Sequence, residues 1–451
     1  MKRSFLILAL CMLFPAMLFA KREEPLLRAG IISDISITAK ASPMDSVFKK
    51  TLEYFLNQGV DAVVITGDFL TNGTEEELAK VSKLWFSVFP EDKGIKGKHV
   101  ERIFIYGEHE IEGHNSNAAL KRYSPEYLQA FNIALRRSEL WEKYFNEPFK
   151  PYYRKEVNGF VFLASHYDQE QNPQSMTEFF ASQQTTLPGI EKPVFYIQHR
   201  AFQKNDPVLS YYPNLICLSG GNPATLTDEK SIWQDSYTYI GTSSLSQVTC
   251  RDGRENSDVQ DGYVAQMQKN KLWHGHHGML MTVYSDRVEF NRYDFHSGES
   301  LGIWNIPTDV KQRPYNWGTR RLDGMYNTPI FPKGSIVEVV RKKDRNRNGA
   351  QVKQVHLNFP TAVSLKERPR AFDYKVSVEL MTSEVVLSKR VYSLLFYLCE
   401  RRDKEKGATC RFAESELPKA APFRFVVRPV DSFENEGEPI YSEYLVLYEN
   451  D

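Results

Sequence analysis

Acidic and imidazole side chains follow several predicted strands, where they could bind a metal ion or move protons. The clearest case is Asp68, which comes directly after the apolar, β-branched run Asp61–Ile65 and the turn residue Gly67. A buried strand that ends in glycine and a carboxylate delivers the acid to the crevice at the carboxyl edge of an α/β sheet. Gly67 would allow the backbone to pack closely at this turn.

Similar groups follow the other predicted strands of this half of the chain. They are Asp34, the pair Glu108 and His109, then His199, and finally the loop at Gly221. Acids and histidines at successive strand ends converge on one crevice, as a dinuclear metal site requires. A simpler interpretation stays open: Asp34 and Asp68 could be turn residues that accept backbone N–H bonds, and the histidines could bind no ligand.

The elements that carry these groups alternate between strands and helices. We expect helices at Asp45–Asn57 and Thr74–Val88, the second capped by Thr74, between strands at Arg28–Ile32, Asp61–Ile65 and Arg102–Tyr106. This alternation is typical of a parallel sheet covered by helices. Further expected elements are a helix at Ser124–Tyr144, an Asn-Gly hairpin of Tyr152–Val157 with Phe160–Ser165, and strands at Pro193–Gln198, Asn214–Leu218, Met279–Tyr284 and Arg287–Tyr293.

The residue composition and the hydrophobic pattern change from about Asn305. A linker at 308–330, rich in Pro, Trp and Arg, precedes short strands without helical periodicity, so we expect a β-sandwich of Greek-key type at 331–451. The predicted strands are Ser335–Val340, Gln351–Leu357, Asp373–Glu379, Phe423–Pro429 and Tyr441–Tyr448. Two domains also fit the length of 451 residues.

Composition and the N-terminus limit the function classes. The 57 basic and 57 acidic residues cancel, so neither nucleic acid nor an anionic membrane surface is expected as the main partner. Lys2 and Arg3 precede the apolar run Phe5–Phe19, which ends at Ala20, and this predicts a signal peptide at 1–20 and an exported mature chain without a transmembrane segment. An uncleaved anchor is disfavoured because the run is short and contains a proline.

The cysteines fit an oxidising compartment. Cys399 and Cys410 flank a polar stretch, Glu400–Thr409, that reads as a hairpin loop, and a local disulfide between them is expected. Cys217 lies in an apolar strand, which favours a buried thiol.

The order of the strand ends resembles the calcineurin-like metallophosphoesterase family. That family's pattern is D-x-H, G-D, G-N-H-D/E, a lone His, and G-H-x-H. The corresponding blocks here are Asp34-Ile35-Ser36, Gly67-Asp68, Gly107-Glu108-His109-Glu110, His199 and Gly220-Gly221-Asn222-Pro223, within a likeness from Ala29 to Pro307. The tail, with Phe423–Pro429 and Asp431-Ser432-Phe433, resembles the fibronectin-III-like domain that some such proteins carry.

The resemblance implies a role for each block. In working members two metal ions share the carboxylate that corresponds to Asp68. One ion also takes the positions that are here Asp34, Ser36 and Pro223, and the other takes those that are here Glu108, His199 and Gly221. His109 matches the histidine that hydrogen-bonds the phosphoryl oxygens or the leaving group.

Three of these positions no longer carry a good ligand. Ser36 is a weak neutral ligand, and Gly221 and Pro223 offer no side-chain ligand. A set of Asp68, Glu108 and His199, assisted by Asp34, suits one Mn, Fe or Zn ion, so one ion is favoured over two. A residual scaffold that binds no metal is the alternative.

Other signals are weaker. The tract Trp273-His274-Gly275-His276-His277 could supply a missing imidazole, but a solvated loop is favoured. Tyr211-Tyr212 could stack on a ring near the crevice, although core packing is the default. Asp344–Gly349 mimics half of a calcium loop, but Val355 stands where its last ligand should be, so a hairpin turn is favoured.

The sequence therefore predicts an α/β, four-layer αββα metallophosphoesterase-like domain at 26–307, a linker at 308–330 and an all-β fibronectin-III-like sandwich at 331–451. The expected function is that of an exported, periplasmic or secreted phosphoester hydrolase with a degenerate dimetal site, weakly active or inactive. The expected partner is a phosphoester small molecule. The alternative is a pseudoenzyme, a non-catalytic binding protein of the cell envelope that recognises a glycan or a protein.

Overall fold

The computed structural model describes residues 23–112, 133–167, 173–202, 206–248, 259–260, 263–264, 275–316, 318, 320, 327–345, 350–363, 370–393, 396 and 407–448. The predicted signal peptide, residue His274 and the Cys399 partner of the expected disulfide lie outside these ranges. So do the last four residues of the calcium-loop-like stretch, at 346–349, and the first part of the predicted helix Ser124–Tyr144.

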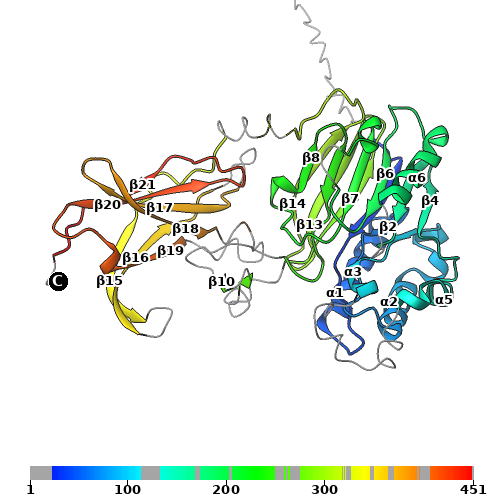
Figure 1. Cartoon of the computed structure of the whole chain (residues 1–451), viewed down its shortest axis with the longest axis horizontal. Helices are drawn as coiled ribbons and strands as arrows, with labels where there is room; N and C mark the ends of the chain where they lie inside the picture. The colour runs from blue at the N-terminus through cyan, green and yellow to red at the C-terminus, as the bar shows by residue number, and fades with distance from the viewer. Residues whose placement is uncertain are drawn as a thin grey trace, which may run out of the picture.

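Two six-stranded sheets carry the first part of the chain (Figure 1). The first has the order β14-β13-β12-β1-β2-β3, with β1, β2 and β3 parallel and the rest antiparallel. Its strands are β1 (Leu27–Ile32), β2 (Ala62–Ile65), β3 (Glu101–Phe104), β12 (His277–Val283), β13 (Arg287–Asp294) and β14 (Glu299–Pro307).

The second sheet has the order β4-β5-β6-β7-β9-β8 and a parallel centre, β5-β6-β7-β9. Its strands are β4 (Tyr152–Val157), β5 (Phe160–Ser165), β6 (Val194–Gln198), β7 (Leu215–Ser219), β8 (Ile232–Gln234) and β9 (Thr238–Gly241). A two-stranded pair, β10 (Val259–Gln260) and β11 (Tyr263–Val264), stands apart from both sheets. The Asn158-Gly159 hairpin between β4 and β5 has the predicted boundaries. Both large sheets are mixed rather than wholly parallel, so the prediction of an α/β domain is confirmed, while its exact layering stays a prediction.

The helices begin where the sequence provides caps. The helices are α1 (Pro43–Asn57), α2 (Glu75–Val88), α3 (Glu108–Glu112), α5 (Ile133–Phe145) and α6 (Pro173–Gln183). At α2 the Thr74 hydroxyl accepts the backbone N–H of Glu77 at 3.3 Å, and the Glu77 carboxylate accepts that of Thr74 at 3.2 Å. This reciprocal capping box confirms the predicted N-cap. Short 3₁₀ turns complete the connections: η1 (Pro90–Asp92), η2 (Ile95–Gly97), η4 (Gln184–Thr186), η5 (Leu209–Tyr211), η6 (Glu229–Ser231) and η7 (Glu414–Glu416).

Successive residues of β2 contribute to two different hydrophobic cores, one on each face of the first sheet. Ala62 and Val64 of β2 belong to a cluster with Phe162 and Phe195 of the second sheet, whereas Val63 and Ile65 pack with helix residues. That second cluster includes Phe55 of α1 and Trp85 of α2. Because successive side chains of a strand point to opposite faces, β2 is buried on both. This double burial explains the continuous apolar run before Thr66.

The tail from residue 331 has its own core and two separate sheets (Figure 1). One has the order β15-β16-β19 and the other β18-β17-β20-β21. The strands are β15 (Glu338–Arg345), β16 (Gln351–Pro360), β17 (Asp373–Leu380), β18 (Val385–Tyr392), β19 (Gly407–Ala413), β20 (Phe423–Val430) and β21 (Ile440–Tyr441). An all-β tail is confirmed, and its fibronectin-III-like identity and the domain boundaries stay predictions.

Several tail expectations need correction. Strands β18 and β19 were not predicted, and β19 begins at Gly407, inside the expected loop Glu400–Thr409. The predicted strand Tyr441–Tyr448 is reduced to β21, because beyond Tyr441 its pairing with β20 gives way to an isolated bridge at Leu445. In the first part of the chain, Cys217 is buried in β7 as expected. None of the helices in the described ranges combines the length and the hydropathy that a membrane span requires.

Candidate metal centre

The turns after the strands bring five predicted side chains into two groups that share Asp68. One group is Asp34, Asp68 and His199, and the other is Asp68, Glu108 and His109. Within each group the potential ligand atoms lie within 4.8 Å of one another. The convergence predicted from the strand ends is therefore present among the described residues.

The grouping differs from the expected one. The sequence placed Glu108 and His199 around one ion, whereas in the structure His199 joins Asp34, and Glu108 joins His109. Glu108 begins α3 and lies 3.5 Å from the Arg200 guanidinium, with 42% of its side chain exposed. Its carboxylate therefore lies on the solvent side of Asp68, and the imidazole of His199 lies on the buried side.

Asp68 is held by a strained turn. Its φ is 52° and that of Gly67 is 99°, both in the left-handed region. A Cβ on Gly67 would lie 2.4 Å from His199 Nδ1 and 2.8 Å from the Gly107 Cα, so only glycine fits here. Asp34 and Ser36 also have positive φ, 49° and 56°. Such conformations cost free energy and concentrate at functional sites.

His199 connects the two sheets. It follows β6, and its Nδ1–H donates to the backbone carbonyl of Thr66, after β2, at 2.8 Å. The other nitrogen, Nε2, is buried and 3.1 Å from Asp68 Oδ2, without a hydrogen bond of good geometry to any described residue. Burial alone would lower the pKa of His199, but the carboxylates of Asp68 and Asp34 raise it to about 10.

The two aspartates respond in opposite directions. Burial raises the pKa of Asp34 to about 6, against the effect of His199. Asp34 Oδ2 accepts hydrogen bonds from the Ser33 hydroxyl and, at 3.2 Å, from the Gly221 N–H. Burial would also raise the pKa of Asp68, but His199 and His109 together lower it below its usual value. The Asp68 carboxylate is thus stable as an anion, because the His199 imidazolium lies next to it.

Glu110 is a buried residue of the centre that sequence reasoning did not assign. It is 1% exposed, and its carboxylate accepts three backbone N–H groups: Asp68 at 3.0 Å, Gly107 at 2.5 Å and Leu70 at 2.6 Å. Burial and the nearby Asp68 raise its pKa to about 8. Glu110 therefore ties the turn after β2 to the turn after β3. The position of Glu110 in the Gly107–Glu110 block could have suggested that it belongs to the centre. The sequence could not have shown which backbone N–H groups it accepts.

His109 lies at the outer side of the centre. Its backbone N–H donates to Asp68 Oδ1 at 2.8 Å, and its Nε2 is 3.8 Å from Asp68 Oδ2. About a quarter of its side chain, 24%, is exposed. The ring can therefore reach both the Asp68 carboxylate and a molecule that arrives from solvent.

The residues fit a divalent cation better in the buried group. A metal-binding histidine normally donates its second N–H to a carbonyl, which fixes the ring with the other nitrogen toward the metal. His199 has this arrangement, with the buried Nε2 beside Asp68. Carboxylate and imidazole donors suit Mn, Fe or Zn. As expected, Gly221 and Pro223 add no side-chain ligand; a Cβ on Gly221 would lie 3.2 Å from His199 Nε2.

The histidine tract and the tyrosine pair singled out in the sequence differ from expectation in their exposure to solvent. His276 and His277 are buried, at 9% and 0% exposure, and His277 begins β12, so they do not form a solvated loop. His276 Nδ1 is 2.6 Å from the Leu245 carbonyl, and neither histidine belongs to a candidate metal group of described residues. Tyr212 packs against the core, with its ring centroid 4.7 Å from that of Phe180, whereas Tyr211 is 80% exposed; both lie before β7, at the sheet edge opposite to the metal centre.

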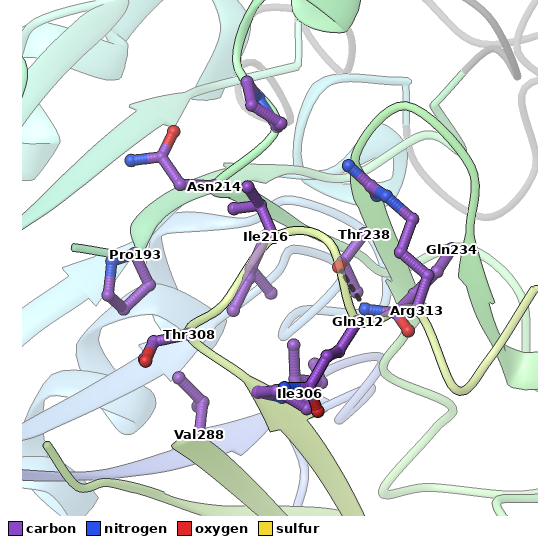
Figure 2. A pocket seen from close by; sticks show the side chains of 13 residues that line it. Pro193, Asn214, Ile216, Gln234, Thr238, Val288, Ile306, Thr308, Gln312 and Arg313 are labelled. Atoms are coloured by element: carbon purple, nitrogen blue, oxygen red, sulfur yellow. Dashed lines mark hydrogen bonds between the residues drawn. The ribbon is translucent and has the colours of Figure 1, made fainter. Parts of the chain in front are cut away.

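The pocket in Figure 2 is also at that opposite edge. It is lined by Pro193 and Asn214, which precede β6 and β7, and by Ile306, Thr308 and Arg313 of β14 and the segment after it. None of the residues of the candidate metal centre lines it. It therefore adds nothing to the metal centre.

Comparisons with known proteins give structural similarities only. No family model matches the chain, and no curated protein matches it. Similar solved structures include GAP50, the anchor in the inner membrane complex of Plasmodium, at 13% identity, covering 62% of this chain and 88% of that chain with a TM-score of 0.37. A dimetal phosphatase from Danio rerio has 12% identity, 63% and 100% coverage and a TM-score of 0.34. A predicted phosphoesterase from Streptococcus pneumoniae has 12% identity, 62% and 97% coverage and a TM-score of 0.29.

Proposed function

We propose that this protein is a metal-dependent phosphoester hydrolase of weak activity, a member of the calcineurin-like metallophosphoesterase family with a degenerate site. The observation that carries the proposal is the orientation of His199. Its Nδ1–H is bound by the Thr66 carbonyl, which leaves the buried Nε2 beside Asp68. This is how a protein prepares a histidine for a metal ion.

One divalent ion is assigned to Asp34, Asp68 and His199. Three protein ligands leave coordination positions for water and substrate, as in catalytic rather than structural sites. When bound, such an ion lowers the pKa of a coordinated water and neutralises charge that develops on phosphorus. The chain's own contribution is to hold the two carboxylates and the imidazole in place before the ion arrives.

We assign to His109 the role of contacting the phosphoryl group of the substrate. Its ring is at the solvent side of Asp68, and its backbone N–H is fixed by the Asp68 carboxylate. An imidazole in this place can donate a hydrogen bond to a phosphoryl oxygen or protonate a leaving alkoxide.

Weak activity follows from the missing ligands. Loss of partners that only orient a ligand typically costs ~10–100-fold in metal affinity or activity, and here ligands themselves are absent. Ser36, Gly221 and Pro223 stand where the family has imidazoles. The second group, Asp68 with Glu108 and His109, lies nearer to solvent and is proposed to bind a further ion only weakly.

The second candidate function is a non-catalytic binding protein of the cell envelope that recognises a glycan or a protein. The specific observation in its favour is the loop Gly220–Pro223, where the family's final histidines are replaced by residues without side-chain ligands. In that case the cleft and the all-β tail would bind a partner without turnover.

Export and the nature of the tail belong to the same proposal. The charged start and the apolar run Phe5–Phe19 support a signal peptide and a periplasmic or secreted protein. The two sheets that pack around one core after residue 331 support a fibronectin-III-like sandwich.

Elemental analysis and turnover test the main proposal. Purified protein is loaded with Mn²⁺, dialysed and assayed for bound metal and for hydrolysis of aryl phosphate monoesters and diesters. We expect one Mn²⁺ per chain and slow turnover, both lost in Asp68→Asn and retained in the control Asp286→Asn, an exposed hairpin residue. Metal binding without turnover would favour the binding protein, and absence of both would refute the metal centre.

A further inference from the structure

Arg200 lies at the solvent side of the candidate metal centre. It directly follows His199 at the end of β6, and 55% of its side chain is exposed. Its Nη2 lies 3.5 Å from the Glu108 carboxylate, and Glu108 belongs to the group that contains Asp68 and His109. The guanidinium of Arg200 therefore lies beside the group that contains His109.

A buried tyrosine fixes the position of this guanidinium. The Arg200 Cζ lies 4.7 Å from the ring centroid of Tyr167, and Nη2 donates to the Tyr167 hydroxyl at 2.8 Å. Tyr167 is 2% exposed, its N–H donates to the Tyr106 carbonyl, and its hydroxyl donates to Glu112 of α3. Held by ring contact and hydrogen bond together, the arginine is oriented before any ligand binds.

The hydrogen bonds of Arg200 leave most of its donors unused. Among the described residues they involve Nη2 only, so Nη1 and Nε keep N–H groups for a ligand. The contact with Glu108 is long for a hydrogen bond, and both side chains are about half exposed, so this ion pair contributes little to stability. A planar guanidinium with free donors is suited to bidentate binding of an oxyanion.

We propose that Arg200 recognises the terminal phosphoryl group of a phosphomonoester at this centre; the assignment rests on the function proposed above. A terminal phosphoryl group has three non-bridging oxygens, which allows two to accept from the guanidinium while the third accepts from the His109 imidazole. A phosphodiester has only two, so bidentate binding to the guanidinium leaves no non-bridging oxygen for His109. Arg200 is thus a specificity residue that favours monoesters over diesters.

Phosphate binding tests this assignment with the full chain. Inorganic phosphate is titrated calorimetrically into wild-type protein, Arg200→Ala, Arg200→Lys and the control Arg287→Ala, each with Mn²⁺ and with a chelator. Hydrogen bonds to charged groups predict a ~10–100-fold weaker phosphate affinity in Arg200→Ala. Lysine keeps the positive charge but lacks the paired N–H donors of the guanidinium, so Arg200→Lys should retain only part of the phosphate affinity of the wild type. Arg287 is at the opposite sheet edge, and its replacement should change nothing.

The outcomes separate the two proposals. Failure of wild-type protein to bind Mn²⁺ refutes the proposed function, and Arg200 is then judged from the chelator titrations. Equal phosphate affinity of wild type and Arg200→Ala in both conditions, or no phosphate binding by wild type in either, overturns the assignment of Arg200. Dimethyl phosphate serves as the diester probe: it should bind weakly and respond little to Arg200→Ala, and a response as large as that of phosphate would overturn the monoester preference. Unchanged Mn²⁺ affinity in the variants excludes loss of folding.

Discussion

The imidazole of His199 donates from Nδ1 to the carbonyl oxygen of Thr66 at 2.8 Å, and this bond joins the two six-stranded sheets at their carboxyl edges. Thr66 follows β2 of the first sheet, and His199 follows β6 of the second. The bond fixes the ring with Nε2 beside Asp68. The packing of the two sheets thus sets the geometry of the candidate metal centre, and the predictions below test that dependence.

Replacement of Gly67 should disturb the centre through a direct clash. In Gly67→Ala the new Cβ would lie 2.4 Å from His199 Nδ1, on a backbone with φ of 99°. We expect a loss of roughly 2–4 kcal/mol in the free energy of unfolding and weaker Mn²⁺ binding. The measurements are urea unfolding and a Mn²⁺ titration.

Gly97→Ala is the matched control for this substitution. Gly97 also has positive φ, 74°, but a Cβ there meets nothing within 4 Å. It should cost only about 1 kcal/mol of backbone strain and leave Mn²⁺ binding unchanged. Equal effects of the two substitutions would show that the clash with His199 has no consequence.

Replacement of Glu110 should loosen Asp68 without removing a ligand. In Glu110→Gln one carboxylate oxygen becomes an NH₂ group, so either the N–H groups of Asp68 and Gly107, which share Oε2, or the N–H of Leu70, on Oε1, lose their acceptor. A buried donor left unsatisfied costs about 1–3 kcal/mol, and we expect that loss in the free energy of unfolding together with weaker Mn²⁺ binding. Glu76→Gln, on the exposed face of α2, is the control. A Glu110 variant as stable as wild type would contradict the structural role of this carboxyl group.

His166 should make stability fall as the pH is lowered. It is 4% exposed, and its Nδ1 accepts the Tyr106 N–H at 3.0 Å, which requires the neutral ring. Burial, with Arg137 and Lys155, lowers its pKa to about 3. The unfolded chain then binds the proton more readily, so the contribution of His166 is complete above pH ~6.5 and declines toward pH ~3, by roughly a few kcal/mol.

A difference measurement isolates this titration. The free energy of unfolding of wild type and His166→Gln is compared at pH 7.5 and pH 4.5, because glutamine can accept the same N–H without titrating. Wild type should lose more stability between these values than the variant, and His99→Gln, at an exposed site, should behave as wild type. Parallel losses in wild type and His166→Gln would show that His166 does not titrate as stated.

Sequence patterns predicted what local chemistry dictates. The Asn158-Gly159 turn, the Thr74 cap and the buried run before Thr66 each depend on a few neighbouring residues, and each is present. The convergence of Asp34 and Asp68 was predictable because the carboxyl ends of adjacent parallel strands meet at one sheet edge, whereas His199 comes from the second sheet, and its place beside them followed only from the family resemblance.

The remaining features depend on contacts between distant segments. Nothing near Glu110 in the sequence indicates that it accepts the N–H groups of Asp68 and Leu70, which are some 40 residues away. Strand β18 contains Ser388, Lys389 and Arg390, and only pairing with β17 makes this polar stretch a strand. His276 reads as part of a polar tract until β12 is placed in the sheet.

The stoichiometry of metal binding, with and without His199, tests the central claim most directly. Wild-type protein and His199→Ala are titrated with Mn²⁺, and the free ion is followed by electron paramagnetic resonance. A centre built by Asp34, Asp68 and His199 predicts one tightly bound Mn²⁺ per chain in wild type and none in His199→Ala. Two tight ions in wild type, no ion at all, or one ion that persists in His199→Ala would contradict it.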